Sequence, residues 1–265
     1  MGVITLTSFD LLLAFSMIIL LGVFTYRLNL GNTQQLFVAA VRNLLQLLLL
    51  GYILNFVFDS QNIWFIGLIS IIMLVVAGWE INLRQKYRLK KNLGFKIGVL
   101  ALFISSFTLT WIALQFIIIP DPWYHPQYAI PLLGMLLGNT MNGISLGMDK
   151  LNHLIYQQRY IIEQRLMLGE ESQEVIHEIR NDAIRTGMIP IINSMAIAGI
   201  VSLPGLMTGQ ILSGTAPAEA VKYQILIFYM ISAGTGFGII FAVWQISKKM
   251  FDERQRLLIE QLKIS

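Results

Sequence analysis

The sequence contains no cysteine, which excludes disulfide bonds, thiol nucleophiles and thiolate metal sites. It also lacks the G-x-x-x-x-G-K-[ST] loop that holds nucleotide phosphates, and the H-E-x-x-H and G-x-S-x-G patterns of metalloproteases and serine hydrolases. The histidines His125, His153 and His177 are scattered, without the spacing of metal ligands. The chain therefore offers no hydrolytic machinery of its own, and no cofactor is expected to bind to it.

The sequence also has few charged residues. Only 13% of the 265 residues are charged, whereas soluble domains usually carry about 25%. Hydrophobic residues make up 55% of the chain, and the mean hydropathy is +0.66. A soluble fold could not bury such an apolar excess, so the composition predicts that the lipid bilayer is the solvent.

The apolar residues are concentrated in blocks close to the roughly 20 residues that a helix needs to cross a bilayer. There are seven such blocks, at residues 8–26, 36–58, 63–79, 97–119, 130–148, 188–212 and 223–246. The pattern predicts an all-α integral membrane protein with about seven transmembrane helices, forming a single transmembrane domain over residues 1–265.

Basic residues gather in the links that follow the first, third, fifth and seventh blocks. The opposite links, at residues 59–62, 120–128 and 213–222, contain Lys222 as their one basic residue. Because positively charged loops stay in the cytoplasm, the N-terminus is expected outside and the C-terminus in the cytoplasm. The net charge of +4 follows these loops, so it predicts no nucleic-acid partner.

The longest polar stretch, residues 150–187, predicts a cytoplasmic coupling segment of two short helices separated at Gly169. In the second helix Val175, Ile176 and Ile179 recur at helical spacing and predict an exposed apolar stripe that grips a cytoplasmic partner. Charged residues flank this stripe, namely Glu171, Glu174 and Arg180. A cytoplasmic tail follows at residues 248–265, with a helix predicted over 251–262.

The second block carries Arg42 and Gln46 four residues apart on one helix face. An arginine inside a membrane costs at least roughly 2.5 kcal/mol unless it is paired or lies near an interface. Glu80, at the cytoplasmic end of the third block, is the predicted counter-ion. Two interpretations stay open for Arg42, a structural ion pair and a substrate contact.

The fifth block is rich in glycine and contains two amides, Asn139 and Asn142. One of its faces is a stripe that predicts close helix packing, formed by Gly134, Gly138, Met141 and Ser145. An amide in lipid is costly without a partner, so the two asparagines are expected to face protein or water. Helix packing and a role in a translocation path are both open for them.

One chain offers few polar intramembrane residues for a complete pathway, which favours a path shared by two copies in a homodimer. The residues predicted to line it are Asn139, Asn142, Ser145 and Asn193, with Arg42 and Gln46 nearby. The 12 methionines are either filler between helices or ligands for a soft metal. No clustered M-x-x-M pattern decides between these roles, so the metal ligands stay unknown.

Three runs resemble the FetB-type ABC transporter permeases: LLGMLLGNTMNGISLGMD at 132–149, GMIPIINSM at 187–195 and SLPGLMTGQ at 202–210. The resemblance extends over essentially the whole chain. It implies a multi-pass permease of the bacterial inner (plasma) membrane that pairs with a FetA-type ATPase and obtains ATP energy through it. The cargo of this family is described as iron, moved outward, while plant relatives implicated in aluminium tolerance include some linked to nucleotide sugars.

The residues leave rival functions from another class, an ATP-independent channel and a membrane-embedded enzyme. An enzyme needs acid, base or metal ligands gathered at one depth, and the sequence shows no such group. A channel has no use for the long amphipathic segment at residues 150–187. The cargo, with a metal ion and a nucleotide sugar as alternatives, and the direction of transport are open at this stage.

Overall fold

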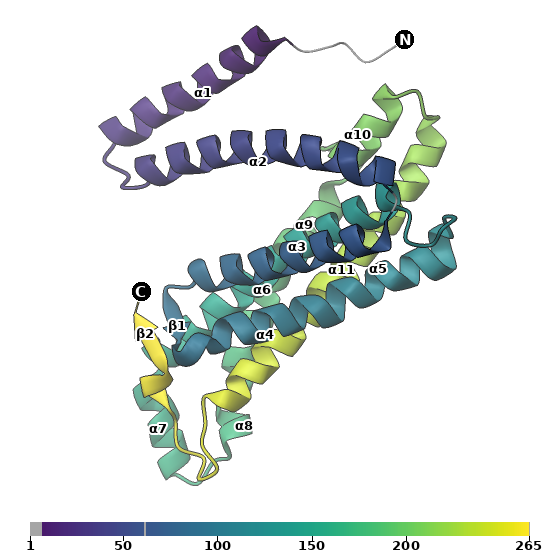
Figure 1. Ribbon diagram of the computed structural model, residues 1–265. Coiled ribbons are helices and arrows are strands. Elements are labelled where there is room, and N and C mark those ends of the chain that lie inside the picture. The colour runs from purple at the N-terminus through teal and green to yellow at the C-terminus, as the bar shows by residue number, and fades with distance from the viewer. Residues whose placement is uncertain (1–6, 61, 265) are drawn as a thin grey trace.

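The computed structural model describes residues 7–60 and 62–264, and almost all of them belong to long helices that run side by side (Figure 1). Within the described residues, six helical stretches are long and apolar enough to cross a membrane. They are α1 (Ser8–Arg27), α2 (Thr33–Ser60), α3 (Ile63–Leu83), the continuous run Lys90–Ile118 that contains α4 (Leu93–Leu102) and α5 (Thr108–Ile112), α6 (Pro126–Gln157) and α11 (Pro217–Lys249). The predicted all-α class is thereby confirmed, and the six stretches are consistent with the predicted membrane protein.

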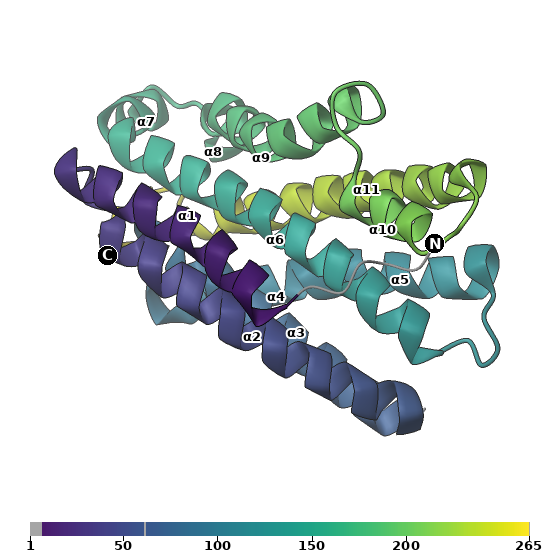
Figure 2. The same cartoon turned by 90° about the horizontal axis from the view of Figure 1, so that it is seen from above.

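The predicted block at 188–212 is not one continuous helix. Its residues are divided between α9 (His177–Ile197) and α10 (Gly205–Leu212), with non-helical backbone at 198–204. Gly199 has φ +81°, and Pro204 restricts Leu203 before it, so the chain cannot continue the helix. α9 and α10 together still carry the chain from the end that holds α7 and α8 to the end where α11 begins (Figures 1 and 2).

The links alternate between the two ends of the bundle. The links after α1, α3 and α6 lie at the same end as the C-terminal tail, and we call this the basic end (Figure 1). The links after α5 and α10 lie at the opposite end. This is the same division that the basic residues show in the sequence, so the orientation with the basic end in the cytoplasm stays our prediction. The predicted position of the N-terminus falls on residues 1–6, and part of the 59–62 link on residue 61, outside the described residues.

The core of the bundle lies where α6, α9 and α11 meet. Ile144, Met148 and Ile239 are fully buried there. Glycines allow the close approach: a Cβ on Gly187 would lie 2.8 Å from the carbonyl oxygen of Gly143. The predicted small-residue stripe is therefore displaced, because Gly138 has open space around it while the glycines that contact α9 and α11 lie on another face of α6.

A small cap closes the basic end. β1 (Tyr87–Leu89), in the link after α3, pairs antiparallel with β2 (Leu262–Ile264) in the tail. Short helices complete the cap: η1 (Lys90–Asn92), α7 (Arg159–Met167), α8 (Ser172–Val175) and η4 (Ile259–Gln261). The tail helix predicted over 251–262 is wrong. The Asp252 carboxylate accepts hydrogen bonds from the backbone N–H groups of Arg254 and Arg256, which holds a turn there instead.

α1 and α2 form a pair that stands apart from the other helices (Figure 1). Phe37 of α2 packs against Gly22 of α1, where an added Cβ would lie 2.3 Å from the ring. Most residues of α2 are exposed in the single chain, including every residue at 41–52. This pair therefore presents a large surface to lipid or to another protein.

The fourth predicted block contains wide π-helical turns that the sequence pattern did not predict. Two π-helical segments, η2 (Phe103–Phe107) and η3 (Ala113–Ile118), interrupt the run that contains α4 and α5. The helix nevertheless continues through both segments to Ile118, so the predicted crossing stays intact.

Candidate functional site

A polar face runs along α6, in an otherwise apolar part of the bundle. Asn139, Asn142 and Asp149 are spaced so that they lie on one side of the helix, with Ser145 at the edge of that side. α9 borders the same face through Pro190 and Ser194, as the two cavities described next show. Of the predicted residues, Asn142 and Ser145 line the first of these cavities and Asn139 lines the second.

The first cavity, the Arg84 pocket, lies toward the basic end and has a volume of about 440 Å³. It is lined by Arg84, Asn142, Ser145, Leu146, Asp149 and Pro190. Arg84 Nη1 donates a hydrogen bond of 2.6 Å to Asn142 Oδ1, and the backbone N–H of Lys86 donates one of 2.8 Å to Asp149 Oδ1. The pocket therefore presents one cation and one carboxylate, each already held by a neighbour.

An ion-pair network joins this pocket to α2. Arg42 and Glu80 form a salt bridge, which confirms the predicted pair. The other carboxylate oxygen of Glu80 lies 3.8 Å from Arg84 Nε. Glu80 is 15% exposed, so it balances two arginines from a largely buried position. Removal of this one carboxylate would leave two positive charges close together.

The second cavity, the Gln224 pocket, has a volume of about 330 Å³ and lies at the break between α9 and α10. Its polar lining comes from four side chains, those of Asn139, Ser194, Ser202 and Gln224. Gln224 is only 7% exposed, and its Oε1 has no hydrogen-bond partner in the described part of the chain. Asn139 Nδ2 donates a hydrogen bond of 2.8 Å to the carbonyl oxygen of Met135.

Three of the predicted path residues, Arg42, Gln46 and Asn193, stand outside both cavities. Gln46 lies on the exposed α2, one turn beyond Arg42, and Asn193 lies on an exposed face of α9. The residues that the sequence did not reveal are Arg84, Asp149 and Gln224. Arg84 and Asp149 lie close to the ends of apolar blocks, where charged loop residues are expected. Gln224 lies at the start of an apolar block. None of these three positions indicates a cavity in the sequence.

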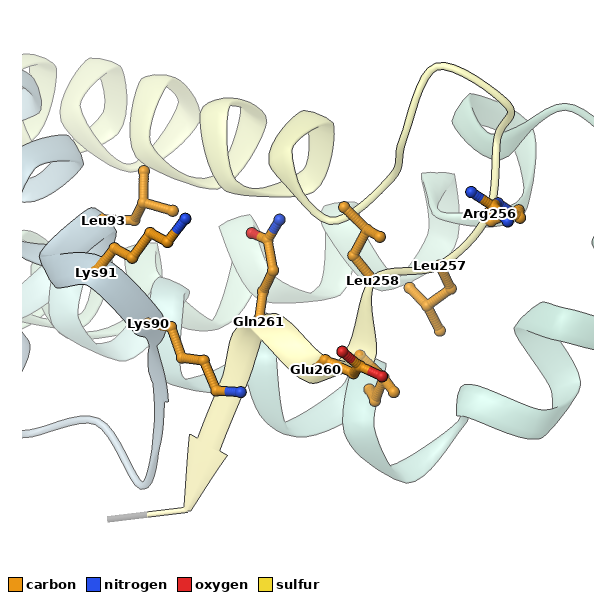
Figure 3. Close-up of a pocket in the computed structure, with 9 residues that line it drawn as sticks. Lys90, Lys91, Leu93, Arg256, Leu257, Leu258, Glu260 and Gln261 are labelled. Carbon is orange, nitrogen blue, oxygen red and sulfur yellow. The ribbon is translucent and has the colours of Figure 1, made fainter.

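A third cavity of about 600 Å³ lies in the cap at the basic end, away from the polar face of α6 (Figure 3). Lys90 and Lys91 enter it from the link before α4, and Glu260 and Gln261 enter it from the tail. Because the tail and the link before α4 build this cavity, it belongs to the cap and not to a path between the helices.

The predicted coupling stripe is not exposed. Val175, Ile176 and Ile179 are 2%, 0% and 6% exposed, because they pack into the main core of the chain itself. Arg180 is also buried: its guanidinium lies 5.0 Å from the centre of the Trp244 ring, and its Nη1 donates to Gln173 Oε1. The prediction that these apolar side chains grip a partner is therefore wrong, whereas Glu171 and Glu174 are exposed as expected.

A different set of apolar side chains is exposed at the tip of the cap. Ile161 is 55% exposed, Met167 79% and Leu168 82%, and Tyr160 stands beside them on α7. A groove of about 850 Å³ next to them is rich in carboxylates, with Glu163, Glu170, Glu171 and Glu253 in its lining. A hydrogen bond from Arg165 holds the pKa of Glu170 below its usual range, so this carboxylate stays charged. We call the four exposed residues Tyr160, Ile161, Met167 and Leu168 the α7 tip.

The described residues hold no cluster of three or more histidine, aspartate and glutamate side chains that could bind a metal ion tightly. Methionine sulfur is present near the polar face, since Met135 lines the Gln224 pocket. On α9, Met195 Sδ accepts a hydrogen bond of 2.9 Å from Ser232 Oγ of α11. The polar and thioether groups of the described residues can therefore contact a polar solute, without a cluster of histidines or carboxylates beside them.

Comparison with known proteins supplies the family. Residues 8–251 match an uncharacterised protein family, UPF0014. A UPF0014 membrane protein of Synechocystis is 40% identical over 231 residues, which cover 87% of this chain and 88% of that protein. The probable iron export permease protein FetB of Escherichia coli is 27% identical over 265 residues, covering 97% of each chain. The Arabidopsis thaliana protein ALUMINUM SENSITIVE 3 is 28% identical over 217 residues, covering 82% of this chain and 77% of its own.

No solved structure matches the chain. The family match covers nearly all of the transmembrane bundle, including the polar face of α6 and both halves of the broken helix. Two of these relatives have descriptive names, which refer to iron export for one and to aluminium sensitivity for the other. The chain is similar to the FetB permease, and it belongs to the UPF0014 family of membrane proteins.

Proposed function

We propose that this chain is the membrane-spanning permease subunit of an ABC transporter of the cell inner (plasma) membrane. It exports a metal ion, with iron as the first candidate, and a separate FetA-type ATPase subunit hydrolyses the ATP. The name of the similar Escherichia coli protein supports iron and export. The lack of a phosphate-binding loop in this sequence agrees with a partner that supplies the ATPase.

The observation that carries this proposal is the polar face of α6, whose side chains line both the Gln224 pocket and the Arg84 pocket. Polar side chains inside a membrane are costly, so they are kept where they pair or serve a solute. Asn139 and Asn142 are both exposed on this face in the single chain. A row of such residues that leads toward the basic end fits a path for a polar cargo.

A second copy of the chain is the proposed cover for this face. Lipid cannot satisfy the amides of Asn139 and Asn142, or those of Asn43 and Gln46 on the exposed α2. A homodimer would bury these side chains around a shared path, as in the prediction from the sequence.

The α7 tip is the proposed contact with the ATPase and replaces the buried stripe at Val175 and Ile176. Its apolar side chains are exposed at the basic end, where the ATPase would bind. The carboxylates around it, including Glu171 and Glu174, call for a groove with basic residues in the partner. α8 and the start of α9 would then act as the rigid support that transmits motion to α6.

The Arg84 pocket favours a second candidate cargo. An arginine is the usual partner of phosphate groups, so a nucleotide sugar is the alternative to a metal ion. The test is ATPase stimulation in proteoliposomes that contain this chain and its ATPase, with a panel of metal ions and nucleotide sugars. Stimulation and vesicle uptake by iron alone support the first candidate. A response to none of these solutes, with an ATPase that fails to bind the chain, would contradict the ABC assignment.

The coupling contact is tested by a matched pair of substitutions. Leu168→Asp places a charge on the exposed α7 tip, so the chain should fold and insert normally but lose the ATPase during purification. Ile176→Asp places the same charge in the core, where an unpaired charge destabilises the fold, so the yield of folded protein should fall. Retention of the ATPase by the Leu168→Asp protein, together with full transport, would show that the contact lies elsewhere.

A further inference from the structure

The break between α9 and α10 places non-helical backbone within the predicted membrane segment. Ile200 and Val201 in this break are 88% and 78% exposed, and the backbone oxygen of Ile197 accepts hydrogen bonds from the N–H groups of both. Irregular backbone is tolerated at membrane depth only where it is buried in protein or lines a cavity that holds polar ligands. The Gln224 pocket is the cavity beside this break.

Gln224 is the residue in this pocket that calls most directly for a ligand. It belongs to α11 about two turns from the start of that helix. It is more than nine-tenths buried, and its Oε1 lacks a partner in the described part of the chain. Because buried polar atoms almost always have a hydrogen-bond partner, an unmet amide oxygen beside a cavity points to a bound solute or water.

The other polar side chains in the pocket offer oxygen acceptors. Asn139 has used an amide hydrogen on the Met135 carbonyl oxygen, so its Oδ1 is left to accept. Ser194 has used its hydroxyl hydrogen on the carbonyl oxygen of Pro190, so its lone pairs also stay free to accept. Ser194 therefore has no hydroxyl hydrogen left to donate, and Asn139 keeps one amide hydrogen beside its acceptor oxygen. Rotation of the Gln224 amide can present a third oxygen.

The lining of the pocket offers no positively charged side chain to an anion. Among the described residues of its lining none is charged. The end of α9 at Ile197 and the start of α10 at Gly205 both border it, and the partial charges of these two helix ends have opposite signs. The two helix ends therefore largely cancel, and the side-chain oxygens decide the preference.

We propose that the Gln224 pocket binds the cargo as a cation, held through neutral oxygens and the Met135 thioether and carrying much of its water shell. The volume of about 330 Å³ corresponds to roughly ten waters at about 30 Å³ each, enough for a divalent cation with about six waters. This inference rests on the proposed transport function and assigns the site and the ligand atoms at which the cargo binds. Neutral ligands bind weakly, which a transported ion needs in order to leave the site.

The test measures binding without the ATPase. The full chain is purified in lipid nanodiscs and titrated with Mn²⁺, and the free ion is measured by electron paramagnetic resonance. Gln224→Leu removes the amide and keeps the size, so Mn²⁺ affinity should fall about tenfold or more, as expected for a lost hydrogen bond to a charged ligand. Gln115→Leu is the matched control, because Gln115 lies in the η3 turn and lines neither pocket.

The sign of the ligand charge is tested by Gln224→Glu. A carboxylate at this position should strengthen Mn²⁺ binding about tenfold if the ligand is a cation, and it also serves if the Gln224→Leu protein does not fold. Equal Mn²⁺ affinity in the unmodified protein and both Gln224 variants would overturn the proposal. So would binding of UDP-glucose that Gln224→Leu weakens while Mn²⁺ binding is unchanged.

Transport assays separate this inference from the proposed function. If Mn²⁺ binds through Gln224 but no ATP-dependent transport occurs with the ATPase present, the transporter assignment fails and the site stands. If transport of metal ions proceeds and Gln224→Leu transports at the unmodified rate with unchanged Mn²⁺ affinity, the site fails and the transporter assignment stands.

Discussion

The two pockets on the polar face of α6 differ in how completely their polar groups are satisfied. In the Arg84 pocket the charged groups hold one another: Arg84 is bound to Asn142 and lies near Glu80, and Asp149 accepts a backbone N–H. In the Gln224 pocket the amide oxygen has no partner among the described residues. Polar groups that already pair with one another have few hydrogen-bonding positions left for a ligand. An acceptor without a partner can still bind a ligand or water. We therefore expect the first to act as a gate and the second as a binding site.

The largest effect is expected from Glu80→Ala. This change leaves Arg42 and Arg84 without their carboxylate, and an unpaired arginine in a membrane costs at least about 2.5 kcal/mol. The yield of folded protein, measured by fluorescence-detected size-exclusion chromatography, should fall strongly. Adding Arg42→Ala to Glu80→Ala should recover part of the loss. Purely additive losses would show that the two residues are not coupled.

A smaller effect, confined to transport, is expected from Arg84→Gln. The substitution removes the charge that holds Asn142, and a hydrogen bond to a charged group is worth about 1.5–3 kcal/mol, so transport in proteoliposomes should fall about tenfold or more. Folded yield should change little because Glu80 keeps Arg42 as its partner. Arg27→Gln, a change at the basic end away from the pocket, is the control. Equal transport by both variants would show that the Arg84 pocket does not act as a gate.

Asn142→Ala should reduce transport about tenfold, the lower end of the range for Arg84→Gln, because it breaks the same hydrogen bond to a charged group but keeps the Arg84 charge in the pocket. The yield of the dimer should stay the same if the amide serves the path. The comparison between crosslinked dimer and transport rate decides the matter. Loss of the dimer with an unchanged rate per dimer would assign Asn142 to helix packing instead.

The smallest effect is expected at Asn193, which lines neither pocket. Asn193→Ala should alter transport by no more than about twofold, the range of surface substitutions that remove no defined contact. A loss as large as that of Asn142→Ala would show that the translocation path also runs along α9. The path would then not be limited to the two pockets.

Local sequence patterns predicted the helices and one ion pair well. The Arg42–Glu80 pair could be predicted because a membrane restricts an arginine to a few solutions, and Glu80 was the acid at a matching depth. The buried stripe at Ile176 could not be predicted as buried. Helical spacing shows that a face is apolar, but it does not show whether the chain itself or a partner covers it.

The Gln224 pocket could not be predicted from the sequence, for a different reason. It depends on the helix break at 198–204, and the hydropathy of block 188–212 is high enough to conceal the break. The glycines of α6 show the same limit. Gly143 and Gly187 make the closest contact between α6 and α9, but the choice among several glycines depends on how the helices pack.

The pairing of β1 with β2 has a consequence for the order of biosynthesis. β2, at residues 262–264, leaves the ribosome only after every membrane segment of the chain has been synthesised, while its partner β1 has long been at the membrane surface. The cap at the basic end can therefore close only after translation has passed all the helices, and until then β1 has an unpaired edge. A nascent chain held before residue 262 should for this reason be cut more readily by protease near Tyr87 than the finished protein.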